Sequence, residues 1–102
     1  MSGEKIWLFD TTLRDGGQTR GVDFTHADKL AIATALDEIG MDYVEAGWPG
    51  ANPTDDAFFA TPPALKTAKI VAFGMTRRGG RSTANDPGLN AVIDAEVPAT
   101  CL

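Results

Sequence analysis

An arginine and two acidic residues carry the clearest chemical signal in this chain of 102 residues. Arg14 and Asp15 are adjacent in the polar run 10–18, and Glu45 follows in a later apolar segment. Carboxylates bind hard cations such as Mg²⁺ or Mn²⁺, and an arginine stabilises an oxygen that becomes negatively charged during a reaction. These residues therefore predict a site for a cation and an anionic oxygen. The structural alternative is a surface ion pair, worth at most about 1 kcal/mol, beside a Gly-Gly turn.

Two predicted strands would bring Glu45 close to the first cluster. The apolar run 6–9 is closed by a charged residue and predicts a strand buried on both faces. Residues 10–24 are polar, contain several glycines and predict a long loop, and residues 43–46 predict a second strand that contains Glu45. Ligands bind beyond the carboxyl ends of parallel strands, so we expect both groups at one edge of the sheet.

A helix is predicted over residues 26–39, between these two strands. Thr25 and Asp28 have the spacing of a capping box, with Asp in place of the usual Glu or Gln. Gly40 provides the residue at which the helix ends. The apolar residues that recur at helical spacing are expected to face the sheet: Ile32, Ala35, Leu36 and Ile39.

Strands and helices alternate along the rest of the chain, which predicts an α/β fold with parallel strands. Residues 1–102 would supply three to four β/α units, whereas a complete (β/α)8 or TIM barrel needs about 250 residues. We therefore expect the N-terminal part of a TIM-barrel catalytic domain, and the end at Leu102, within a predicted strand, favours this interpretation. A flavodoxin-like sheet of about 100 to 150 residues is the alternative. The other predicted elements are helix 53–60, strand 69–73, loop 74–85, helix 87–95 and a strand that begins near residue 97.

The composition argues against two classes of partner. The chain has 9 Lys and Arg against 14 Asp and Glu, a net charge of −5, and no basic cluster beyond Arg77, Arg78 and Arg81. We therefore expect neither nucleic acid nor a membrane as a partner. No apolar run is long enough for a secretory signal or a transmembrane span. The single cysteine, Cys101, cannot form an intramolecular disulfide, so we expect a reducing, cytoplasmic location.

Several other residues have ordinary structural interpretations. Trp7 is expected in the core of the sheet, and Phe58 and Phe59 are expected to pack the short helix onto it. His26 is expected to be an exposed residue of the first helical turn. Cys101 is expected to be a small core residue rather than a nucleophile.

Three segments resemble one known family of enzymes. Residues 9–18, with the sequence FDTTLRDGGQ, resemble the first-strand signature of the family that contains the α-isopropylmalate, homocitrate and citramalate synthases and HMG-CoA lyase, the DRE-TIM metallolyases. Residues 43–55, YVEAGWPGANPTD, and residues 73–78, FGMTRR, are similar to the (R)-citramalate synthase type within it. The matches occur in order and cover nearly the whole chain.

The resemblance implies an acyltransferase that condenses acetyl-CoA with a 2-oxo acid, pyruvate giving citramalate, in isoleucine or leucine biosynthesis. It implies that Asp15 binds a divalent metal, Mg²⁺ or Mn²⁺ with Zn²⁺ as an alternative. It also implies that Arg14 stabilises the enolate oxygen and that Glu45 is a second catalytic residue. Gln18 and Arg77 would bind substrate, and the full-length protein would be a homo-oligomer.

Part of the implied site lies outside this sequence. The family also uses a His-x-His pair from a later strand, and His26 is the only histidine here. We therefore expect an active full-length enzyme and an inactive 102-residue chain. An HMG-CoA-lyase-like carbon–carbon lyase is one alternative, and a non-catalytic truncated product that associates through exposed sheet edges is another. A phosphatase of the haloacid-dehalogenase type would need a second aspartate where Thr12 stands.

Overall fold

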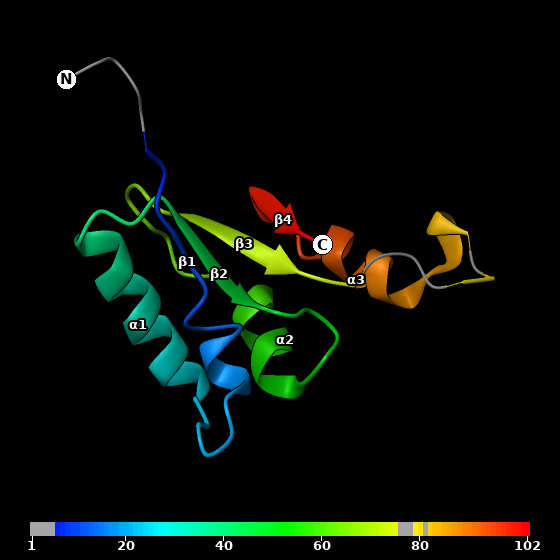
Figure 1. The fold of residues 1–102 in the computed structure, drawn as a ribbon, viewed down its shortest axis with the longest axis horizontal. Helices are drawn as coiled ribbons and strands as arrows, with labels where there is room; N and C mark the ends of the chain where they lie inside the picture. Colours follow the sequence, from blue (N-terminus) through cyan, green and yellow to red (C-terminus); the bar gives the residue numbers. More distant parts are fainter. Residues whose placement is uncertain (1–5, 76–78, 81) are drawn as a thin grey trace.

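The computed structural model describes residues 6–75, 79–80 and 82–102. Within these ranges four parallel strands form one sheet, and their order in the sheet follows their order in the sequence (Figure 1). This finding confirms the predicted α/β fold with parallel strands. It also decides against a flavodoxin-like sheet, in which the first strand lies between the second and the third. The strands are β1 (Phe9–Asp10), β2 (Tyr43–Gly47), β3 (Lys69–Phe73) and β4 (Ala99–Cys101).

Helices connect consecutive strands, as in a chain of β/α units. α1 (His26–Glu38) and α2 (Pro53–Ala60) lie side by side against one face of the sheet (Figure 1). α3 (Pro87–Asp94) follows β3 and adds Val92 to the same core. None of the helices in the described ranges is long and apolar enough to cross a membrane. The central strands and α2 supply most of the buried apolar residues: Val44, Ala46, Phe58, Phe59, Ile70, Val71 and Ala72.

The ends of α1 agree with the sequence. The Thr25 hydroxyl accepts a hydrogen bond from the backbone N–H of Asp28 at 3.1 Å, and the Asp28 carboxylate accepts one from the backbone N–H of Thr25 at 3.0 Å. These bonds hold the pKa of Asp28 below its usual value. Gly40 has φ of +90°, a conformation that L side chains adopt only at a cost. The predicted capping box and helix stop are therefore confirmed.

The predicted core face of α1 is confirmed for Ile32 and Leu36, which are partly buried and pack against the core, and is wrong for Ala35 and Ile39. The buried residues of this helix are Lys29, Ala33 and Asp37, whereas Ala35 is exposed and the predicted core residue Ile39 is 73% exposed. The buried face differs from the apolar stripe because both charged side chains find partners: Lys29 on β2 and α2, and Asp37 in the segment that leads into β3. The energetic cost of burying a charge falls when the charge is paired and hydrogen-bonded.

The first predicted strand is also different in the structure. Only Phe9 and Asp10 pair with β2, and the apolar residues before them are exposed, with Ile6 at 78% and Trp7 at 54%. The reason is that β1 is the outermost strand of the described sheet, so it has a neighbour on one side only. Trp7 therefore does not occupy the core; its ring lies 5.9 Å from that of Tyr43.

Candidate active site

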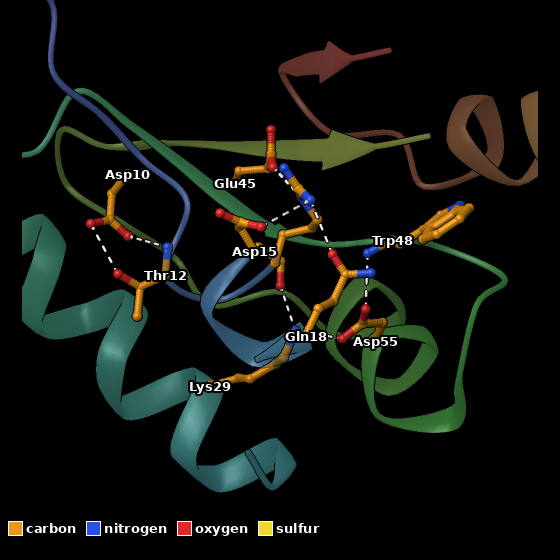
Figure 2. Close-up of polar contacts among 10 residues, drawn as sticks. Asp10, Thr12, Asp15, Gln18, Lys29, Glu45, Trp48 and Asp55 are labelled. Atoms are coloured by element: carbon orange, nitrogen blue, oxygen red, sulfur yellow. Dashed lines mark hydrogen bonds and ion pairs between the residues drawn. The ribbon is translucent and has the colours of Figure 1, made fainter. Parts of the chain in front are cut away.

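The loop after β1 is folded by its own polar groups. The Asp10 carboxylate accepts hydrogen bonds from the backbone N–H of Thr12 at 2.8 Å and from its hydroxyl at 3.1 Å (Figure 2). The backbone N–H of Asp15 then donates to the carbonyl oxygen of Thr11 at 2.7 Å. This tight turn keeps Arg14 and Asp15 at the carboxyl end of the sheet, where ligands bind in parallel α/β folds.

Arg14 is held on three sides at this edge of the sheet. Its Nε lies 2.5 Å from Oε1 of Glu45, and its Nη1 donates to Oε1 of Gln18 at 3.0 Å. The guanidinium carbon stands 4.1 Å from the centre of the Phe73 ring, within the range of a cation–π interaction. Glu45 is only 1% exposed, so its carboxylate requires this cation. These contacts fix the guanidinium in one orientation.

Asp15 presents a carboxylate to solvent beside this arginine. Its Oδ1 lies 3.6 Å from Nη1 of Arg14, and its side chain is 69% exposed (Figure 2). A carboxylate in this position can bind a hard divalent cation. Within the described ranges, however, no group of three or more His, Cys, Asp or Glu side chains could hold a metal ion. The residues present therefore fit one oxygen ligand of a cation site rather than a complete site.

An open cleft of about 560 Å³ lies between the turn that follows β2, Met75 after β3 and the start of α3. Trp48 stands at its border and contacts Phe73 edge to face, with ring centroids 5.3 Å apart. The cleft therefore adjoins the aromatic ring on which Arg14 rests. Its lining is mostly apolar or small: Trp48, Pro49, Gly50, Ala51, Met75, Asp86, Pro87, Gly88 and Ala91.

The structure brings together four of the five residues expected in the site: Arg14, Asp15, Gln18 and Glu45. The fifth, Arg77, lies outside the described residues.

Two residues at this edge were not among those expected in the site: Phe73 was not considered for it, and Cys101 was expected to be a small core residue. Phe73 ends β3 and supports the guanidinium of Arg14. Cys101 ends β4 and is half-buried, and burial together with the neighbouring Glu45 raises the pKa of its thiol. Their place at carboxyl ends of strands was the signal that could have found them. His26, expected to be exposed, is half-buried, and its Nε2 has no hydrogen-bond partner in the described part of the chain.

Comparisons with known proteins agree on one family. The family model described as HMGL-like matches residues 5–95. The (R)-citramalate synthase of Aquifex aeolicus is 46% identical over 101 residues, which cover 97% of this chain and 19% of the relative. The (R)-citramalate synthase of Streptomyces coelicolor is 52% identical over 95 residues, which cover 90% of this chain and 18% of the relative. The 2-isopropylmalate synthase of Chromobacterium violaceum is 34% identical over 98 residues, which cover 95% and 18%. The chain thus spans about a fifth of the length of these relatives.

Proposed function

Because the chain belongs to the HMGL-like family, we propose that the longer protein that carries it condenses acetyl-CoA with a 2-oxo acid. The four parallel strands and their helices are the opening units of a TIM barrel, the fold of this family. Relatives named (R)-citramalate synthase reach 46% and 52% identity, against 34% for a 2-isopropylmalate synthase. These identities favour pyruvate as the 2-oxo acid, with citramalate as the product.

The observation that carries this proposal is the fixed guanidinium of Arg14 at the carboxyl edge of the sheet. Glu45 engages its Nε and Gln18 engages its Nη1, whereas its Nη2 is engaged by neither of these bonds. In the condensation, the acetyl-CoA methyl group loses a proton and its carbon forms a bond to the keto carbon of the 2-oxo acid. Negative charge then develops on oxygen, and a preorganised arginine stabilises that charge more strongly in the transition state than in the ground state. Hydrolysis of the thioester afterwards releases CoA.

A divalent cation, Mg²⁺ or Mn²⁺, would bind at Asp15. When bound, it would supply Lewis-acid polarisation of the keto oxygen. The further ligands and the catalytic base would come from other parts of the longer protein. The 102 residues alone are therefore expected to show no turnover.

The cleft next to Trp48 and Phe73 has the character needed for the acyl-CoA arm. Its apolar walls suit the uncharged part of that arm, and Trp48 at its border contacts the Phe73 ring that supports Arg14. We expect acetyl-CoA and the 2-oxo acid to be the substrates. We also expect the longer protein to be a cytoplasmic homo-oligomer. The strongest competing activity is carbon–carbon cleavage by an HMG-CoA-lyase-like enzyme, which would use the same arginine and metal in the reverse direction.

The decisive experiment is a thiol-release assay of the full-length protein with acetyl-CoA, Mg²⁺ or Mn²⁺ and a panel of 2-oxo acids. Pyruvate should give the highest kcat/KM, and the product should be identified as citramalate. A chelator should abolish the activity and added metal should restore it. If the metal-loaded protein is equally inactive with every 2-oxo acid, the proposal is wrong; release of acetyl-CoA from a cleaved hydroxyacyl-CoA would instead favour the lyase.

A further inference from the structure

Lys29 is a buried cation that lies behind the candidate active site. Its side chain is 4% exposed, and its Nζ donates a hydrogen bond to the carbonyl oxygen of Ala46 at 2.7 Å and another to the Asp55 carboxylate (Figure 2). A polar cavity of about 200 Å³ is lined by Lys29, Asp55 and Arg14. Lys29 thus contacts the end of β2 and the start of α2. Any effect of Lys29 on a reaction at Arg14 would be transmitted through these two elements.

The carbonyl that Lys29 binds belongs to an irregular point of β2. Glu45 and Gly47 pair with consecutive residues of β3, so Ala46 is an extra residue on β2. Such a bulge bends the strand and disrupts the ladder of backbone hydrogen bonds around the extra residue. The ammonium group of Lys29 provides a hydrogen bond at this point, directly after the buried Glu45.

Asp55 fixes the turn that follows the bulge. Its Oδ2 accepts a hydrogen bond from the backbone N–H of Trp48 at 2.9 Å (Figure 2). The same oxygen accepts one from the side-chain amide of Asn52 at 3.2 Å. Asn52 in turn caps α2 by accepting from the backbone N–H of Asp55 at 2.8 Å. One buried carboxylate therefore ties both ends of the turn 48–52 to the cation on α1.

We propose that Lys29 and Asp55 are positioning residues that hold the bulged end of β2, and through it Glu45, in the geometry that aims Arg14. A need for stability alone would not explain this pair, because apolar residues of similar volume often replace a buried ion pair without loss. An apolar pair cannot donate to a bulge carbonyl or accept from a turn N–H. Since a misplacement of about 1 Å can reduce a rate by about 100-fold, directional bonds at this point matter for the reaction.

The test uses the full-length protein and two variants of the pair. The double variant Lys29→Met/Asp55→Asn removes both charges together, so that no unpaired buried charge threatens the fold. The double variant Lys29→Gln/Asp55→Asn is also neutral and provides a second case if the first double variant folds poorly. The matched control is Asp37→Asn, which removes the other buried charge of α1, at a place far from Arg14.

The first measurement is independent of activity. Tryptophans are replaced with 5-fluorotryptophan, and the ¹⁹F resonance of Trp48 is assigned from its absence in Trp48→Phe. We expect this resonance to shift or broaden in both variants of the pair, since the backbone N–H of Trp48 loses its carboxylate partner. It should not change in Asp37→Asn.

The second measurement is the steady-state rate, and this part of the test rests on the proposed function. We expect kcat to fall by about 10- to 100-fold in the double variants with KM within about threefold, because an aligned arginine acts mainly in the transition state. An unchanged Trp48 resonance, or an unchanged kcat in a folded variant, would overturn the inference. Loss of kcat in equal measure in Asp37→Asn would also overturn it. If the wild-type protein has no synthase activity, the proposed function fails, while the resonance still decides whether the pair positions the turn.

Discussion

Helix α1 carries two buried charged residues that serve opposite ends of the sheet. Lys29 binds the carbonyl oxygen of Ala46 near the carboxyl end of β2, next to the residues that hold Arg14. Asp37 lies about two turns farther along the same buried face and binds residues 66–68, which lead into β3 at the amino end of the sheet. The same helix face is therefore anchored by charge at two places with very different surroundings.

The partners of the two residues differ in kind. Asp37 accepts hydrogen bonds from three consecutive backbone N–H groups and one hydroxyl, and these bonds hold its pKa well below the usual range. Asp37 therefore has a structural role, which is to fix the backbone of residues 66–68. Lys29 instead belongs to a chain of contacts that continues through β2 to Glu45 and Arg14. The comparison teaches that one device, a buried charge on a helix, serves stability at the amino end and orientation at the carboxyl end, as expected for a barrel.

Among substitutions that test the difference between the two ends of the sheet, the largest effect on kcat is expected at Arg14. In the full-length enzyme, Arg14→Ala should lower kcat by at least about 100-fold, because it removes the group that stabilises the developing oxyanion. Arg14→Lys keeps a cation near the buried Glu45 and should protect the fold, yet it lacks the planar guanidinium and should also be slow. Steady-state kinetics with pyruvate and a thermal melt of each variant measure the two effects. A normal kcat in Arg14→Ala would remove this role from the arginine.

A smaller effect is expected from crowding the end of β2. A Cβ at Gly47 would stand 2.7 Å from Cγ of Asp55, whose carboxylate is buried and fixed by several hydrogen bonds. Gly47→Ala should therefore cost about 1–3 kcal/mol of the free energy of unfolding and also reduce kcat. Gly79→Ala is the control, since its Cβ would meet nothing within 4 Å. Equal stability of the two variants in urea would show that the carboxylate moves aside freely.

The smallest effect is expected at the amino end of the sheet and concerns pH. The folded-state pKa of Asp37 is lowered, so its stabilising contribution is complete above the unfolded value of about 3.9 and is lost as the pH falls below it. Asp37→Asn should reduce the loss of stability between about pH 5 and pH 2, and should leave kcat at neutral pH within about twofold. Urea midpoints across this range, with the exposed Glu38→Gln as control, test the expectation. A variant with the same acid sensitivity as the wild type would contradict the role given to Asp37.

Some features of the fold follow from local chemistry and could be read in the sequence. Thr25, Asp28 and Gly40 fix the ends of α1 because their effects depend on residues a few positions away. The proximity of Arg14 and Glu45 could also be expected, because parallel strands place their carboxyl ends together. The family resemblance added the catalytic roles proposed for Arg14 and Glu45.

Other features depend on how the elements are turned against one another. The sequence alone determined an α/β chain with a polar cluster at the ends of its first two strands. The tertiary structure decided that α1 buries Lys29 and Asp37 in addition to part of its apolar stripe, while Ile39 stays exposed, and that Phe73 lies beneath Arg14. A periodicity scores each side chain by its own hydropathy, whereas the cost of burying a charge depends on partners that only the folded chain supplies.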